Sequence, residues 1–203
     1  SDNNRIGVVN ALNNSITQYN AGDVAAPGSD AAPITLDSGP TTRLNQPSAV
    51  TWYHDPSDPT GDQIVVANAG NDTVATYALN NQGGNLAPVR TIRGIHDSEL
   101  DGPSGVALRI DPNPGGSPQL SGDEIWVTNR GSDKVTAYSR IDDLDVTPLY
   151  RIFGAQTQLH SPCGIALSSY NGNERVFVAN DKIPGGSDLD RVTIYNRSNV
   201  LSA

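Results

Sequence analysis

Three histidines, His54, His96 and His160, are the side chains with which this chain could transfer protons near neutral pH. Only histidine titrates in that range without help from its surroundings. The three occupy non-equivalent places relative to the apolar runs around them, and no nucleophile motif, phosphate-binding glycine loop or Cys/His metal spacing accompanies them. We therefore predict surface roles for the histidines. The sequence offers no set of catalytic residues.

A short acidic cluster, Asp55, Asp58 and Asp62, supplies the hard oxygen ligands that calcium prefers. The cluster lacks the ordered spacing and the closing glutamate of a calcium-binding loop. We predict a solvated turn at this place, with a calcium site as the alternative. Calcium is the one cofactor that the sequence leaves open.

An asparagine closes the same kind of apolar run four times, at Asn10, Asn68, Asn129 and Asn180. Asparagine is common where a strand ends in a turn, because it tolerates left-handed backbone. We therefore predict turn-forming roles first and ligand binding second. A tyrosine follows each asparagine, nine residues later in three copies and fifteen later in the last, at Tyr19, Tyr77, Tyr138 and Tyr195. We expect it to pack at the same place in every copy.

Two further sequence motifs recur at about the same spacing as the closing asparagines, so the chain is built from repeats. A Leu-x-x-Pro motif and a Pro-x5-Gly motif each occur three times, at Leu44/Pro47, Leu100/Pro103 and Leu159/Pro162, and at Pro33/Gly39, Pro88/Gly94 and Pro148/Gly154. The repeat units cover about 5–39, 44–94, 100–154 and 159–197. A complete unit has four short apolar runs. The first unit lacks the first run, and the last unit lacks the fourth.

Each run predicts a strand, since it is short, rich in Val, Ile, Thr and Tyr, and bounded by turn residues. Four antiparallel strands repeated radially describe a β-propeller blade. We therefore predict an all-β single domain over 1–203, a β-propeller with two complete and two partial blades. The partial units cannot complete each other, because both contain the second and third runs. This favours an arc of a larger propeller of six to eight blades, or an arc closed by a neighbouring subunit, over a ring of four.

The pattern Leu-x-x-Pro-x-Gly-[Val/Ile]-Ala-Leu, [Ile/Val]-x-Val-x-Asn, Val-x-x-Tyr and Pro-x5-Gly resembles the NHL-repeat propellers and their six-bladed relatives. The resemblance implies that the first run lines a central channel. It also implies a candidate binding face formed by the loops that carry Asn10, Asn68, Asn129, Asn180, Arg43, His96 and His160. Lactonase and lyase relatives hold calcium through Glu, Asn and Asp side chains. No residue of this chain maps onto that set.

The amino-acid composition limits the classes of partner that the chain could bind. The 203 residues carry a net charge of −9 with no basic stripe, so we predict no nucleic-acid binding. No run of 18 apolar residues exists, so we predict no membrane span.

The single cysteine, Cys163, excludes an intramolecular disulfide framework, and we predict that it is a small buried filler. The chain starts with Ser and contains no Met, so we expect a mature or trimmed chain.

These observations favour a secreted, periplasmic or cell-surface binding and assembly module of the NHL-like kind. Its ligand, whether protein, small molecule or glycan, stays open, and self-association through open blade edges is expected. A calcium-dependent lactonase or lyase-type enzyme is the first alternative, and a structural subunit of an extracellular polymer or surface complex is the second. Trp126, in the apolar run Ile125–Thr128, is predicted to be buried between blades.

Overall fold

The computed structural model describes residues 5–20, 22, 32–54, 61–79, 83–94, 96–111, 122–171, 173–181 and 190–202. It is nearly all-β, with 54% strand and 6% helix. The strands form four antiparallel sheets, which we name A to D in chain order. The predicted all-β fold with blade-like antiparallel sheets is therefore confirmed.

The strands follow the predicted runs closely. Sheet A holds β1 (Arg5–Asn10), β2 (Ser15–Asn20) and β3 (Thr35–Ser38), and sheet B holds β4 (Pro47–Tyr53), β5 (Gln63–Asn68), β6 (Thr73–Ala78) and β7 (Arg90–Arg93). Sheet C holds β8 (Pro103–Arg109), β9 (Glu124–Asn129), β10 (Lys134–Ser139), β11 (Tyr150–Ile152) and β15 (Leu201–Ser202), and sheet D holds β12 (Pro162–Tyr170), β13 (Asn173–Asn180) and β14 (Arg191–Asn196). Short 3-10 helices are η2 (Pro40–Thr42), η3 (Ala155–Thr157) and η4 (Arg197–Asn199).

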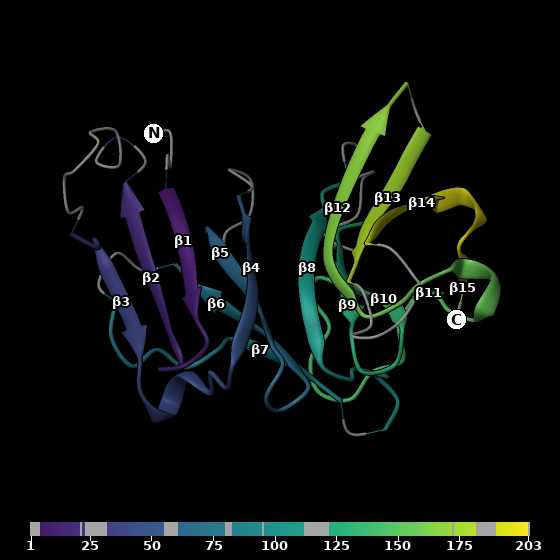
Figure 1. The fold of residues 1–203 in the computed structure, drawn as a ribbon. Helices are drawn as coiled ribbons and strands as arrows, with labels where there is room; N and C mark the ends of the chain where they lie inside the picture. The colour runs from purple at the N-terminus through teal and green to yellow at the C-terminus, as the bar shows by residue number, and fades with distance from the viewer. Residues whose placement is uncertain are drawn as a thin grey trace.

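The four sheets stack side by side as consecutive blades. The first-run strands β4, β8 and β12 contact one another in order, and β1 contacts β4. Sheet A and sheet D lie at opposite sides of the molecule (Figure 1). The series is therefore open, and the predicted arc is confirmed over a closed ring of four. The number of blades in a larger propeller stays a prediction.

The end of the chain departs from the predicted pattern. After β14 it turns through η4 and forms β15, which pairs antiparallel with β11, Arg151 opposite Leu201. It thus adds a fifth strand to sheet C and does not supply a fourth strand to sheet D. None of the helices in the described ranges has the length and apolar character needed to cross a bilayer.

A bulge follows the proline of every first-run strand, and it joins neighbouring blades. The register shifts between Pro47 and Ala49, and equally at the starts of β8 and β12. Ser48 Oγ donates to the Pro103 carbonyl at 2.6 Å, and Ser104 Oγ donates to the Pro162 carbonyl at 2.6 Å. Sheet B is thereby fastened to sheet C, and sheet C to sheet D, along the inner strands.

Cys163 occupies the same bulge position in sheet D, and its thiol is exposed. The prediction that Cys163 is a buried filler is wrong. The serines at this position reach a proline of the following sheet, but within the described chain no further sheet covers sheet D. Ser48 is exposed at this position too, so what distinguishes Cys163 is the absence, within the described chain, of a following sheet for it to bond with.

The core consists of three apolar layers, one between each pair of adjacent sheets. Trp126 lies in the layer between sheets C and D and has no solvent exposure. Its indole stacks on Tyr150, with ring centroids 6.0 Å apart and planes 7° apart. The predicted burial of Trp126 between blades is confirmed.

Side chains of complementary size fill these layers. Counted from the closing asparagine, Gly7 of β1 is equivalent to Val65 of β5 and Trp126 of β9. A Cβ atom on Gly7 would lie 3.0 Å from the Trp52 ring of sheet B. The position equivalent to Trp52 in sheet C is Leu108, which packs with the cluster that contains Val65. The tryptophan of sheet B is thus met by a glycine on sheet A, whereas Leu108 of sheet C is met by a valine on sheet B.

We expect Gly7→Val to lower the free energy of unfolding by about 1–3 kcal/mol, because the added side chain overpacks the layer against Trp52. In a Trp52→Leu background the same change should be neutral or stabilising, since valine and leucine fill the equivalent places between sheets B and C. Urea unfolding of the four proteins in this double-mutant cycle gives the coupling free energy. A Gly7→Val cost that does not depend on residue 52 would contradict the packing described here.

Candidate functional site

The asparagines that close the second-run strands act as structural clamps in three blades. Asn68, Asn129 and Asn180 are buried. Each Oδ1 accepts a hydrogen bond from the backbone N–H of the residue that follows the motif leucine, namely Asn45 at 3.2 Å, Asp101 at 3.1 Å and His160 at 2.9 Å. Each Nδ2 donates to a threonine hydroxyl of the next strand, on Thr73, Thr136 and Thr193. The amide thus joins the loop before the inner strand to the outer strands of the same blade.

The repeated tyrosine forms a hydrogen bond to the same loop, at a residue before the motif leucine. The hydroxyls of Tyr77 and Tyr195 donate to the carbonyls of Thr42 at 2.6 Å and Thr157 at 2.7 Å. Tyr138 donates to the carbonyl of Ser98. Burial raises the pKa of Tyr77 and Tyr138 well above that of a free phenol. These hydroxyls are therefore hydrogen-bond donors at all ordinary pH values.

A third set of contacts joins each hairpin to the next blade. Asn14, Asp72 and Asp133 each have a φ of 51°, in the left-handed region where Asn and Asp are favoured. Their Oδ1 atoms accept hydrogen bonds at 2.7 Å from the backbone N–H groups of Gln46, Gly102 and Ser161 on the following blade. The polar groups of this face are thus largely occupied in holding the blades together.

Asn129→Ala is expected to cost about 2–3 kcal/mol of unfolding free energy, because it removes the acceptor of the Asp101 amide and one of the two hydrogen bonds to the buried Thr136 hydroxyl. Asn10→Ala should cost less than about 1 kcal/mol, since Asn10 is half-buried and only donates, at 3.2 Å to Ser15 and 3.4 Å to Thr17. Chemical denaturation compares the two variants. Equal costs would show that the clamp is not what stabilises a blade.

The other predicted members of the binding face do not form a cluster. Arg43 and His96 are exposed, and the His96 backbone N–H donates to Asp145 Oδ2 at 3.1 Å. His160 Nδ1 lies 3.7 Å from Asp133 Oδ1. In the ranges that the structure describes, no hydrogen bond or ion pair joins Arg43, His96 and His160 to one another.

The acidic cluster is described only in part. Asp62 Oδ1 lies 2.5 Å from His54 Nδ1, across the hairpin of β4 and β5. Asp55 and Asp58 lie outside the described residues. Among the residues whose positions are given, no group of three or more His, Cys, Asp or Glu side chains could hold a metal ion. The calcium alternative for this cluster therefore stays a prediction.

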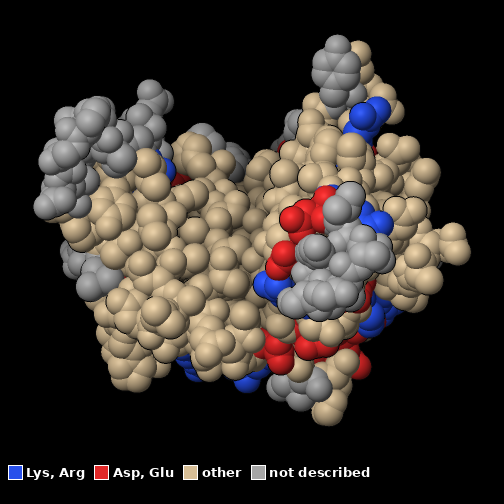
Figure 2. Space-filling view, in the orientation of Figure 1, with Lys and Arg blue, Asp and Glu red and all other residues tan. Residues whose placement is uncertain are grey.

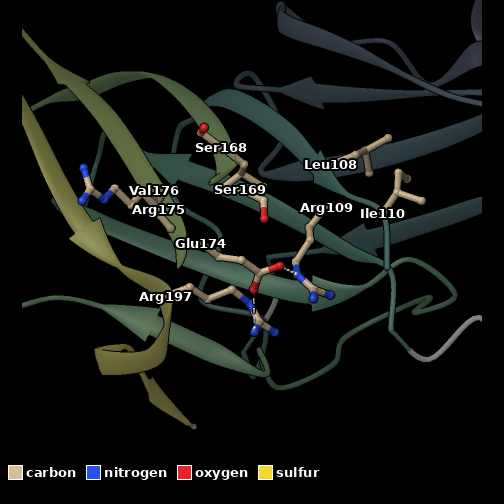
Figure 3. A pocket seen from close by; sticks show the side chains of 10 residues that line it. Leu108, Arg109, Ile110, Ser168, Ser169, Glu174, Arg175, Val176 and Arg197 are labelled. Carbon is tan, nitrogen blue, oxygen red and sulfur yellow. Dashed lines mark hydrogen bonds and ion pairs between the residues drawn. The ribbon is translucent and has the colours of Figure 1, made fainter. Parts of the chain in front are cut away.

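A cavity of about 270 Å³ lies between sheets C and D, beside β8, β12, β13 and η4. Figure 3 shows Glu174 between the guanidinium groups of Arg109 and Arg197 in this cavity. Glu174 accepts from Arg109 Nε at 2.7 Å and from Arg197 Nη1 at 3.1 Å. Arg197 also donates to the buried Glu124, Nε to Oε2 at 3.1 Å. These four charged side chains thus pair with one another and fasten sheet D to sheet C.

The repeat pattern of the sequence did not predict these ion pairs. At the position of Glu124, sheet B has Gln63 and sheet D has Arg175, so the charge does not recur with the period. Figure 2 shows acidic and basic side chains side by side on the surface over sheets C and D. In the same view, the surface over sheets A and B is nearly free of charge.

The two ends of the blade series present the most exposed apolar surface of the sheets. On sheet D, Val192 is 63% exposed and Ile194 is 55% exposed. Their equivalents on sheet C, Val135 and Ala137, are fully buried beneath sheet D. We call the sheet D surface formed by Phe177, Val192 and Ile194 the D end face.

Sheet A presents the matching surface at the other end. Ile6 and Val8 are each 40% exposed, whereas their equivalents on sheet B, Ile64 and Val66, are buried against sheet A. Tyr19 lies opposite Ile6 in the sheet and so shares its side. We call the surface formed by Ile6, Val8 and Tyr19 the A end face. Sequence reasoning anticipated open edges but did not identify these side chains.

The two end faces are the candidate functional site, because each is a blade-stacking surface without a blade on it. No protein-family model and no curated protein matches this chain. The repeat pattern and the four antiparallel sheets therefore carry the assignment to a propeller-like all-β architecture.

Proposed function

We propose that the protein is a binding and assembly module of the NHL-like propeller kind that associates with a second copy of itself through its end faces. One observation carries the proposal: Val192 and Ile194 are more than half exposed at positions whose equivalents in sheet C are fully buried by the next blade. An apolar surface that elsewhere in the same fold is covered by a blade is a surface adapted to take one.

The A end face has the side chains that such a contact requires. Where sheet D covers sheet C, Val176, Val178 and Tyr195 supply the apolar contacts. Ile6, Val8 and Tyr19 occupy the equivalent positions on sheet A. Docking the A end face of one copy on the D end face of another would repeat this arrangement. Two copies of four sheets each would supply eight, and a twofold arrangement could close the ring.

The finer parts of the proposal rest on the sequence. The repeated Leu-x-x-Pro, Asn and Tyr positions support the NHL-like assignment. The acidic net charge of −9 and the loops rich in Gly, Pro and Asn support a secreted, periplasmic or cell-surface location. The expectation that nucleic acid is not a partner has the same basis.

Light scattering coupled to size exclusion tests the proposal over about a hundredfold range of protein concentration. The wild-type mass should rise from 21.4 kDa toward twice that value. Ile194→Glu should stay monomeric, because it places a charge in the apolar contact. Val89→Glu is the matched control, since Val89 is 50% exposed but precedes β7 and lies on neither end face. A wild-type protein that stays at 21.4 kDa throughout, or an Ile194→Glu variant that dimerises normally, would overturn the proposal.

A further inference from the structure

We propose that the cavity between sheets C and D binds a small monocarboxylate with a compact apolar body. The cavity has about 270 Å³ of space and lies beside β8, β12, β13 and η4. Cavities that hold drug-sized ligands usually measure about 300–1,000 Å³, so this one has room for a smaller molecule. The inference goes beyond the proposed function, because the site lies between two sheets of one chain and needs no second copy.

The charged group beside the cavity repeats an arrangement that is closed in the previous layer. The same four positions hold Tyr53, Gln63, Asp123 and Arg140 between sheets B and C, and Arg109, Glu124, Glu174 and Arg197 between sheets C and D. Between sheets B and C, Tyr53 and Arg140 have no solvent exposure, and the guanidinium lies 3.8 Å from the centre of the tyrosine ring. The ring and the guanidinium therefore cover each other.

The tyrosine ring has no counterpart between sheets C and D. Arg109 occupies the position of Tyr53, and its Nε reaches Glu174 at 2.7 Å. The side chains of Arg109 and Glu174 remain 17% and 25% exposed. The space beside them is the cavity, which Leu167 and Val176 line with apolar side chains. The apolar body of a ligand can therefore fill this space as a ring fills the previous layer.

Two groups that line the cavity have unused hydrogen-bond donors. Arg109 donates from Nη1 to the Gly122 carbonyl at 2.8 Å, and no described residue accepts a hydrogen bond from its Nη2. The Ser169 hydroxyl has no hydrogen-bond partner in the described part of the chain. Figure 3 shows Ser169 directed toward Glu174 and Arg109, whereas Ser168 points away from them. Arg109 and Ser169 thus present donors to the same space.

These donors define the charged end of the ligand. Both carboxylates of the group already accept hydrogen bonds, Glu174 from two arginines and Glu124 from Arg197 and Trp126. The unused groups are donors, and an anionic acceptor binds them more strongly than a neutral one. The charges of the two arginines and two glutamates cancel, so the group favours a monoanion over a dianion such as a phosphate monoester. A carboxylate meets both conditions.

Phenylacetate is the probe, and its neutral amide, phenylacetamide, is the matched comparison in shape. Each is titrated into the isotopically labelled full chain, as wild type and as Ile194→Glu, while the backbone amide signals are followed by NMR. We expect saturable one-to-one binding of phenylacetate with a dissociation constant of about 1 mM or below. The shifts should centre on residues 108–110 and 167–169. The amide should bind about tenfold more weakly, because it lacks the charge of the carboxylate.

Two adjacent serines of β12 provide a matched pair of variants. Ser169→Tyr should weaken phenylacetate binding at least about tenfold, because the added ring would occupy the cavity. Ser168→Tyr should leave the affinity within about twofold of wild type, since this side chain points away from the charged group. Arg109→Gln should bind the acid and the amide equally. Loss of packing alone would weaken both ligands and would not remove the preference for the acid.

The outcomes separate this inference from the proposed function. Absence of phenylacetate binding up to about 10 mM would overturn the inference. Equal binding of acid and amide by the wild-type protein would also overturn it, as would wild-type affinity in the Ser169→Tyr variant or shifts confined to other sheets. If the wild-type protein never dimerises but binds phenylacetate as described, the ligand site is supported and only the proposed self-association is wrong.

Discussion

Replacing Trp126 with alanine is expected to lower the free energy of unfolding by about 3–5 kcal/mol. Trp126 fills the layer between sheets C and D, where it is fully buried and stacked on Tyr150. Truncation opens a large cavity between two sheets that stack face to face, and it removes the 2.7 Å bond from Nε1 to Glu124 Oε2. Urea denaturation followed by far-ultraviolet circular dichroism measures the loss.

Phe153→Ala is the matched control for this change. Phe153 is also a large aromatic residue and directly follows β11 of sheet C, but it is 50% exposed. Its truncation should cost less than about 1 kcal/mol, since little volume leaves the core. Similar costs for the two variants would show that the layer between sheets C and D is not a packed core.

Arg140→Met should be the second severe change, with a loss of about 3–5 kcal/mol. Arg140 follows β10 and is completely buried between sheets B and C. Its Nε lies 3.3 Å from Asp123 Oδ2, its Nη1 donates to Gln63 Oε1 at 3.1 Å, and its guanidinium lies 3.8 Å above the Tyr53 ring. Methionine keeps much of the volume but leaves the buried Asp123 carboxylate without this positive charge.

Two further variants separate the effect of losing the buried positive charge from the other effects of Arg140→Met. Arg130→Met removes an exposed ion pair with Asp181 and should cost at most about 1 kcal/mol. Adding Asp123→Asn to Arg140→Met should recover part of the stability, because it removes the carboxylate that lost its counter-charge. Chemical denaturation provides all three values. An Arg140→Met variant as stable as Arg130→Met would contradict the role assigned to this buried arginine.

The features that the sequence predicted well are those encoded locally. The second runs of sheets B, C and D are apolar on both faces, which predicts interior strands. β5 and β9 are indeed buried on both faces between neighbouring sheets, whereas β13 buries Val176 and Val178 toward sheet C and leaves its other face half-buried. The missing first and fourth runs predicted the open series, since strand content is set by short-range pattern and turn residues. Trp126 could be placed in the core because its run could only be an interior strand.

Features that depend on contacts between distant segments could not be predicted. Cys163 has the same motif position as Ser48 and Ser104, which donate to a proline carbonyl of the following sheet. Within the described chain no sheet follows sheet D, so Cys163 has no such contact, and its own run gives no sign of this difference. The pairing of β15 with β11 crosses from one blade to another and leaves no periodic trace. The closing asparagines were interpreted as turn formers, but Asn129 also clamps a loop that lies 28 residues away in sequence.

Amide hydrogen exchange at β1 tests the central claim, that the blade series is open at sheet A, most directly. The account predicts that Gly7 and Val9 exchange within about tenfold of the rate of an unfolded chain, because their amides face an unpaired edge. The equivalent amides of Val65 and Ala67 in β5 face β4 and should exchange at least about a thousandfold more slowly. If Gly7 and Val9 are instead protected as strongly as Val65 and Ala67 in the monomeric protein, the edge is covered and the open series described here is wrong.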